Sequence, residues 1–141
     1  MTQIAIVYPL LVQVALALGL LLWLARLRTG ALQSKVVRPA DIALGQPNWP
    51  QKPTQVANCF RNQFEAPVLF YVLVLLVLNL RMSDIVLVTL AWIFVLTRLA
   101  HAYIHTSSNV IRLRGGVYGI GVLVLLLMWI WLAIRLLSAT V

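Results

Sequence analysis

Several polar and ionisable residues lie at or inside long apolar runs of the sequence, where lipid would oppose them. They are Arg61, Asn62, Glu65, Arg98, His101 and His105. A charge within a membrane span costs about 2.5–3.5 kcal/mol on insertion scales, so such residues mark a functional site by default. We therefore expect a polar site enclosed between membrane helices.

Helical spacing groups these residues into faces. The sets that share a face are Asn58, Asn62 and Glu65, then Arg98, His101 and His105, and finally Arg114 and Tyr118. Side chains separated by three, four or seven positions project from the same side of a helix. At about 1.5 Å per residue, Glu65 and Arg98 reach the same depth, roughly ten ångströms inside the membrane boundary. The spacing predicts one shared cavity.

The charge of this predicted cavity indicates what it would bind. Glu65 is the single acid among its candidates, against a larger set of arginines. The arginines considered are Arg26, Arg61, Arg98, Arg112 and Arg114. A guanidinium matches a carboxylate through two parallel hydrogen bonds. The cavity should favour an anionic ligand and leave Glu65 for an ammonium group, so a small peptide with two carboxylates and one amine would suit it.

Other interpretations of the same residues stay open. Arg61 and Glu65, at i and i+4, could form only an intrahelical ion pair. His101 could be a hydrogen-bonding residue between helices. His101 and His105 could hold a metal, but the sequence offers no third ligand and the arginines disfavour a cation, so we expect no metal site.

The composition is that of a membrane protein. Hydrophobic residues make up 62% of the chain and charged residues 10%, with a mean hydropathy of +0.97. Spans of about 20 apolar residues cross a bilayer as helices. We therefore predict an all-α integral membrane protein, a four-transmembrane-helix bundle in a single domain covering 1–141. The predicted helices are about 4–28, 54–80, 84–106 and 115–138.

The distribution of charge predicts the topology. Basic residues concentrate in 26–52 and again in 106–116, where Arg112 and Arg114 could be simple membrane anchors. The positive-inside rule places both segments in the cytoplasm and both termini outside. The net charge of +8 reflects this basic face. No soluble basic domain is present to carry nucleic-acid binding, so we expect no nucleic-acid partner.

Local signals predict how the helices are interrupted. Pro67 removes one backbone hydrogen bond and should bend the second helix. Residues 81–84 read as a tight turn that makes the second and third helices antiparallel neighbours. Gly115 and Gly116 indicate a break before the fourth helix. Cys59 is the single cysteine, so no disulfide can form within one chain.

At these positions the sequence resembles the MAPEG family, the membrane-associated proteins of eicosanoid and glutathione metabolism. The matching elements are Arg61-Asn62-x-x-Glu65, Arg98-x-x-His101, Arg114-x-x-x-Tyr118, Arg26-Leu27-Arg28 and Pro39-Ala40-Asp41. The nearest pattern is the branch of microsomal prostaglandin E synthase and microsomal glutathione transferase. The sequence resembles a bacterial-type member, which implies the bacterial inner membrane rather than the endoplasmic reticulum.

This resemblance implies a homotrimer with glutathione, the co-substrate, bound between subunits near the cytoplasmic face. The implied glutathione contacts are Arg26, Arg61, Asn62, Glu65, Arg98, His101, His105, Arg114 and Tyr118. Arg114 would be the catalytic, thiolate-stabilising arginine, with Asp41 as its acidic partner. Two positions depart from the branch: His105 stands where it carries a tyrosine, and Gly115 where a catalytic serine has been proposed. Glutathione binding is thus implied more firmly than prostaglandin isomerisation.

The resemblance favours a glutathione-dependent enzyme, akin to a transferase or peroxidase. Its thiolate would attack a lipophilic electrophile, or reduce a hydroperoxide, that arrives from the bilayer. A non-enzymatic lipid-binding or scaffold member of the family is the alternative. A transporter ranks lower, because the first helix and the outer half of the fourth lack a polar stripe. The sequence does not identify the lipophilic substrate.

Overall fold

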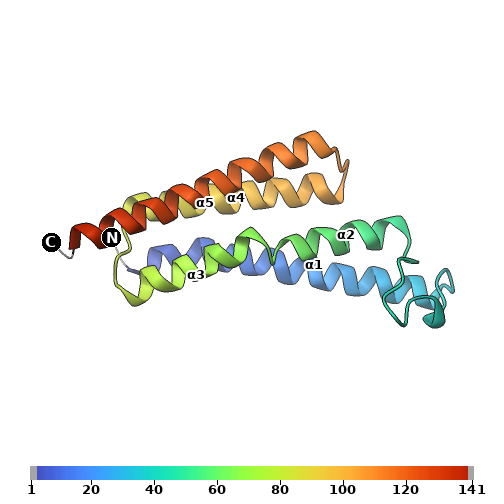
Figure 1. Cartoon of the computed structure of the whole chain (residues 1–141). Helices are drawn as coiled ribbons and strands as arrows, with labels where there is room; N and C mark the ends of the chain where they lie inside the picture. Colours follow the sequence, from blue (N-terminus) through green and yellow to red (C-terminus); the bar gives the residue numbers. More distant parts are fainter. Residues whose placement is uncertain (1–2, 140–141) are drawn as a thin grey trace.

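The structure, a computed structural model, describes residues 3–139 and contains helices but no strand in that range (Figure 1). The predicted domain of 1–141 therefore has two residues at each end outside the described residues. The helices are η1 (Gln3–Ile6), α1 (Val7–Gln33), η2 (Pro39–Asp41), α2 (Gln51–Asn62), α3 (Ala66–Asn79), α4 (Ile85–Thr106) and α5 (Ile111–Ala139).

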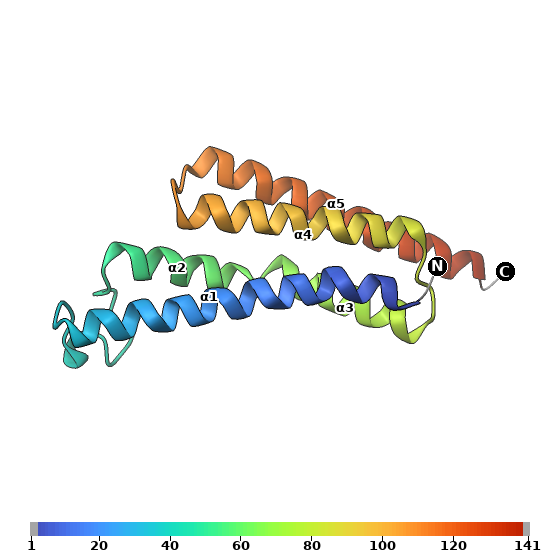
Figure 2. The same ribbon diagram turned by 180° about the vertical axis from the view of Figure 1, so that it is seen from behind.

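The helices form four spans long and apolar enough to cross a membrane, which confirms the predicted membrane fold class. They are Gln3–Gln33, Gln51–Asn79, Ile85–Thr106 and Ile111–Ala139. Helices α4 and α5 lie together on one side of the molecule, and α1 lies beside α2 and α3 on the other (Figures 1 and 2). Both ends of the described chain lie at the same end of the bundle, opposite the two basic connections. Which of these ends faces the cytoplasm stays a prediction.

The second span is not the continuous helix predicted for 54–80. It begins earlier, at Gln51, and α2 ends at Asn62 before α3 begins at Ala66. Pro67 occupies the first turn of α3, where its missing N–H costs no helical bond. From Pro67 the sequence predicted a bend within one helix, whereas the structure ends α2 at Asn62 and begins a new helix at Ala66. Helix α1 also continues to Gln33, beyond its predicted end at 28.

The predicted break at Gly115 and Gly116 is wrong. Helix α5 begins at Ile111, and the N–H of Arg114 already donates to the carbonyl of Val110 at 2.9 Å. Glycine is common in membrane helices, where it interrupts the backbone less than in soluble ones. The consequence is that Arg112 and Arg114 both project from a regular helix.

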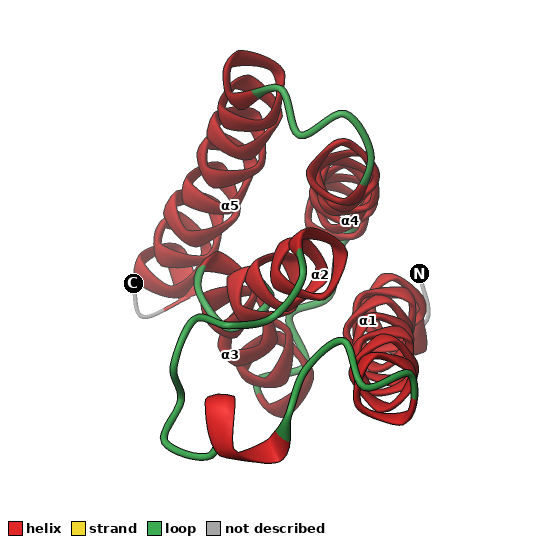
Figure 3. Ribbon diagram, turned by 90° about the vertical axis from the view of Figure 1, so that its right-hand side faces the viewer, coloured by secondary structure: helices red, strands yellow, loops and turns green. Residues whose placement is uncertain are grey.

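The interior of the bundle changes character along its length. Towards the chain ends it is apolar, and the rings of Phe70 and Phe94 stack with centroids 4.7 Å apart. Gly121 on α5 allows close approach to α4, since a Cβ there would lie 2.7 Å from the Thr97 hydroxyl oxygen. Towards the basic connections, buried polar side chains take over. Figure 3 views this polar end along the helices.

Candidate polar binding site

The interruption between α2 and α3 supplies one wall of the polar site. Glu65 has φ −96° and ψ −110°, outside the helical region, and short-range bonds replace the helical ladder around it. Irregular backbone at membrane depth is tolerated where it is buried in protein or lines an aqueous cavity. The side chain of Gln63 holds the interruption in place. It donates to the Cys59 carbonyl at 3.0 Å and accepts from Gln13 on α1 at 3.1 Å.

Arg98 on α4 is the most deeply buried charge of the site, with 1% of its surface exposed. Its guanidinium donates to the Asn62 side-chain oxygen at 2.5 Å and lies 3.4 Å from that of Gln63. Both partners are neutral, and its Nε has no hydrogen-bond partner among the described residues. Arginine cannot shed its charge in a protein. Burying a guanidinium without an ion-pair partner is costly, so the position of Arg98 favours an anion nearby.

The two histidines of α4 and Tyr118 of α5 form the floor beside Arg98. The rings of His101 and His105 are 5.4 Å apart, and both residues are buried. Neither Nδ1 has a hydrogen-bond partner among the described residues. The Tyr118 ring lies 5.6 Å from that of His101 and 5.5 Å from the Arg98 guanidinium carbon. The floor thus offers further polar atoms with no protein partner.

The carboxylate of Glu65 is held by neutral groups. The Asn62 amide donates to it at 2.7 Å and the Tyr118 hydroxyl at 3.4 Å. The alternative of an Arg61–Glu65 ion pair is wrong, because Arg61 donates instead to the side chain of Asn58 at 3.1 Å. The interruption after Asn62 destroys the i, i+4 geometry that such a pair requires. Glu65 is therefore free to face a cationic group.

The structure separates the two neighbouring arginines of α5. Arg114 is half-buried and lines the cavity next to Tyr118, one turn further along the same helix. Its guanidinium donates to the Asn109 side chain in the preceding connection. Arg112 is exposed and does not line the cavity. Because the helix is unbroken here, residues two positions apart point to different sides.

Two adjoining cavities make up the site. One, of about 260 Å³, is lined by Asn62, Glu65, His101, His105, Arg114, Gly115 and Tyr118. The other, of about 330 Å³, is lined by Asn58, Arg61, Asn62, Glu65, His105 and Arg114. Their shared residues join them into one polar depression along α2, α4 and α5. The structure therefore brings together most of the residues that the sequence singled out.

Asp41 and Arg26 are not brought to this depression. Asp41 binds Arg38 through two hydrogen bonds, of 2.9 and 3.0 Å, in the loop after α1. Those hydrogen bonds hold the pKa of the Asp41 carboxyl below its ordinary value. The predicted pairing of Asp41 with Arg114 is absent from the chain. Arg26 is exposed on α1 and lines neither cavity.

The sequence did not single out Gln63, although it connects α1, the interruption and Arg98. A glutamine beside Asn62 at the entrance to an apolar run was the available signal. The partner of Gln63 on α1 is Gln13. Within residues 3–139, no group of three His, Cys, Asp or Glu residues could hold a metal, and the absence of a metal site stays a prediction.

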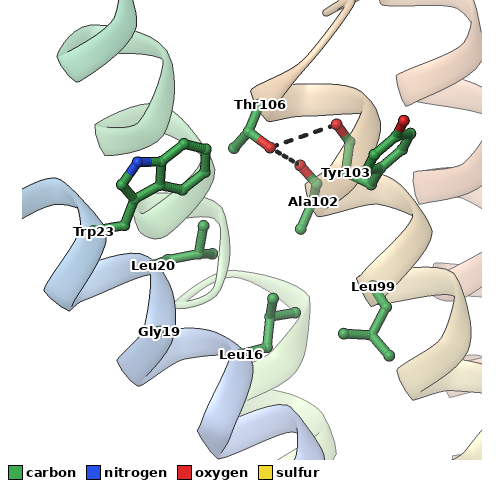
Figure 4. Close-up of a pocket in the computed structure, with 8 residues that line it drawn as sticks. All are labelled: Leu16, Gly19, Leu20, Trp23, Leu99, Ala102, Tyr103 and Thr106. Atoms are coloured by element: carbon green, nitrogen blue, oxygen red, sulfur yellow. Dashed lines mark hydrogen bonds between the residues drawn. The ribbon is translucent and has the colours of Figure 1, made fainter.

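An apolar groove lies between α1 and α4, away from the polar depression. Its volume is about 280 Å³, and it is lined by Leu16, Gly19, Leu20, Trp23, Leu99, Ala102, Tyr103 and Thr106 (Figure 4). The Thr106 hydroxyl is turned to the backbone, where it donates to the Ala102 and Tyr103 carbonyls at 2.8 and 3.5 Å. The groove consequently presents a mainly hydrocarbon lining.

Fold and site together define a multi-pass membrane protein of four helical spans with an arginine-rich polar depression near one end. Residues 6–134 match the model of the MAPEG family, and the chain belongs to that family. Comparisons with curated proteins and with solved structures gave no match. Family membership is thus shown over nearly the whole chain.

Proposed function

We propose that the protein is a glutathione-dependent membrane enzyme, which binds glutathione in the polar depression and activates its thiol. The observation that carries the proposal is Arg98, which is buried, has an unpartnered Nε and forms no ion pair among the described residues. Among residues 3–139, ion pairs occur only at Arg38–Asp41 and Arg135–Asp84. A ligand carboxylate would supply the anion that Arg98 lacks.

The proposed ligand matches the site group by group. Glutathione carries two carboxylates, one ammonium and one thiol. Arg98 and Arg61 are the proposed carboxylate contacts, and Glu65 is the proposed ammonium contact. Asn62, His101, His105 and Tyr118 complete the set with neutral hydrogen-bonding groups. Charge-assisted bonds of this kind contribute about 1.5–3 kcal/mol each.

Arg114 is the proposed thiolate-stabilising residue. A free thiol has a pKa of about 8.5, and a guanidinium beside it favours the anion at neutral pH. In conjugation, sulfur forms a bond to an electrophilic carbon, the leaving group departs with its electron pair, and the thiol proton passes to solvent. With a hydroperoxide, two glutathione molecules yield a disulfide, an alcohol and water. The protein supplies position and electrostatics, while the sulfur carries the chemistry.

A homotrimer with intersubunit sites is part of this proposal. Arg26 is exposed and lines neither cavity of the depression in its own chain, so we propose that its contact to glutathione comes from a neighbouring subunit. Glu65 and Arg61 are also exposed in the single chain, at a depth that lipid would otherwise reach. A second copy packed against α2 would shield them.

A non-enzymatic lipid-binding role is the second candidate. The apolar groove between α1 and α4 favours it, since a hydrocarbon-lined groove facing the bilayer suits an acyl chain. His105 and Gly115 also stand where one branch of the family carries tyrosine and serine. In this alternative, polar residues would organise the assembly without activating a thiol.

One experiment separates the two roles. The purified protein is titrated with glutathione by calorimetry, and the same sample is assayed for conjugation of glutathione to chlorodinitrobenzene. Saturable binding together with conjugation above the uncatalysed rate supports the enzyme. Saturable binding without conjugation favours the scaffold. Absence of glutathione binding contradicts the proposal.

A further inference from the structure

We propose that a second pocket, beneath the loop that follows α1, binds a phosphate group. This pocket is lined by Arg28, Ile42, Gly45, Gln46, Pro47, Trp49, Thr54, Ala57 and Arg61. Its volume is about 430 Å³. The pocket lies between the C-terminal part of α1, the length of α2 from Thr54 to Arg61, and the loop that joins the two helices. The inference does not depend on glutathione binding in the polar depression.

The lining of this pocket has charge of one sign. Arg28 and Arg61 contribute two guanidiniums, and no acidic residue lines it. Two like charges facing one cavity repel each other, and an oxyanion between them removes that repulsion. Phosphate presents several strong acceptors to a guanidinium fork. The electrostatics therefore select a compact anion.

Arg28 contributes an unsatisfied hydrogen-bond donor to the lining of this pocket. Its Nε is buried and has no hydrogen-bond partner among the described residues. Its guanidinium carbon lies 4.8 Å from the centroid of the Trp49 ring, so the ring fixes the fork against the pocket wall. A buried donor left unpaired is costly, and a phosphate oxygen would satisfy it.

The loop that closes the pocket is held by its own hydrogen bonds. The Asn48 amide donates to the Asp41 carbonyl at 2.6 Å, and the Gln46 side chain accepts from the backbone N–H of Leu44 at 2.9 Å. The Asp41 carboxylate is occupied by Arg38. That pairing keeps the nearest loop carboxylate from neutralising Arg28, so the pocket stays both formed and cationic.

The position of the pocket gives the phosphate two sources. It lies at the end of the membrane spans, where lipid headgroups and soluble phosphates both have access. Arg61 also lines the polar depression, so the two sites share one arginine. Binding of phosphate should draw on the Arg61 guanidinium and thereby weaken binding of an anion next door. This predicts mutual antagonism between the sites.

The test is a calorimetric titration of inorganic phosphate into the full-length protein in a phosphate-free maltoside detergent. A second arm adds phosphatidylglycerol to the micelles. Arg28→Gln is the test variant and Lys35→Gln the matched control, since Lys35 is exposed and lies outside the pocket. Trp49 fluorescence is a second readout, with Trp49→Phe as the blank. Circular dichroism verifies folding, and Arg28→Lys replaces Arg28→Gln if the latter misfolds.

We expect saturable binding that Arg28→Gln weakens by about tenfold to a hundredfold, through loss of a charge-assisted bond, and that Lys35→Gln leaves unchanged. Response to free phosphate assigns a soluble source. An Arg28-dependent response to phosphatidylglycerol alone assigns the lipid headgroup. The inference is overturned if neither ligand binds, or if Arg28→Gln and Lys35→Gln behave alike.

Discussion

Asp84 caps the start of α4 and Arg98 lies in the second half of the same helix, and the protein satisfies these two charges in different ways. Asp84 caps α4 by accepting from the Leu87 N–H at 2.8 Å. Its other oxygen accepts from the Trp131 indole at 2.9 Å and from Arg135, both on α5. Arg98 has only neutral partners and an unpaired Nε. A charge that is fully partnered within the chain holds the helices together, whereas a buried charge without an ion-pair partner supports the proposed ligand site.

The largest effect is expected for Arg114, which lines the polar depression beside Arg98 and its neighbours. Arg114→Ala should lower turnover of glutathione conjugation by about a hundredfold, the usual loss when one preorganised group facing a developing charge is removed. Its effect on glutathione affinity should be smaller, because the charge matters most when sulfur is anionic. Arg112→Ala is the matched control. Steady-state kinetics of both variants test this, and an equal loss in the two would break the assignment.

At the start of α4, where the charge has all its partners within the chain, Asp84→Ala should lower the free energy of unfolding by about 3 kcal/mol. It removes a helix cap, worth about 1 kcal/mol, and leaves Trp131 and Arg135 without their acceptor. Glutathione affinity should not change. Chemical denaturation in detergent measures the loss. Ser83→Ala is the control, since the Ser83 hydroxyl has no partner among the described residues, and a cost as large there would refute the role of Asp84.

Arg98→Leu should change glutathione affinity rather than lower stability, which is the reverse of Asp84→Ala. Loss of a charge-assisted carboxylate contact should weaken glutathione binding about tenfold to a hundredfold. Stability should hold or rise, because an uncompensated buried charge is replaced by an apolar group. Calorimetry and denaturation together give the comparison. Arg81→Leu, in the exposed turn before α4, serves as the control, and unchanged affinity in Arg98→Leu would contradict the site.

A smaller effect is expected where α4 and α5 meet. Gly121→Ala should destabilise the protein by about 1–3 kcal/mol, the usual cost of overpacking, because the new Cβ would lie 2.7 Å from the Thr97 hydroxyl. Gly119→Ala, where a Cβ meets nothing within 4 Å, should be neutral or slightly stabilising. Thermal unfolding of the pair tests this, and equal melting temperatures would show that the contact relaxes freely.

The smallest effect concerns pH and the exposed pair Arg38–Asp41. The hydrogen bonds from Arg38 lower the pKa of Asp41 in the folded state. The pair therefore contributes stability above the unfolded pKa of about 3.9, and this contribution is lost as pH falls through the lower folded value. Wild type should melt slightly above Asp41→Asn at pH 7, and the difference should vanish in acid. A difference that grows in acid would reverse the sign.

The sequence anticipated the spans because apolar length and charge are visible along the chain. It anticipated the grouping of Arg98 with His101 and of Arg114 with Tyr118 because helical spacing fixes faces, whereas Asn62 and Glu65 meet across the interruption. It missed the interruption at 63–65, since Gln63 finds its partners on α1 and α4, and local rules see only Pro67. It also missed the network of Asp84, whose partners lie 47 and 51 positions away.

The proposed antagonism between pockets offers a further way to sharpen the comparison. Arg28 lines the phosphate pocket, whereas Arg98 is buried beside the polar depression, and each carries a buried Nε without a partner among the described residues. Arg61 lines both the phosphate pocket and the depression. Glutathione affinity measured with and without phosphate would show whether phosphate binding in one pocket weakens glutathione binding in the other through Arg61.

The most direct measurement is the ultraviolet absorbance of the glutathione thiolate in the presence of the purified protein at neutral pH. Glutathione is compared with S-methylglutathione, which can occupy the same site but cannot form a thiolate. We predict a saturable thiolate band with glutathione alone, retained in Arg112→Ala and lost in Arg114→Ala. A band that is absent in the wild type although glutathione binds, or one that survives in Arg114→Ala and disappears in Arg112→Ala, would contradict thiol activation by Arg114.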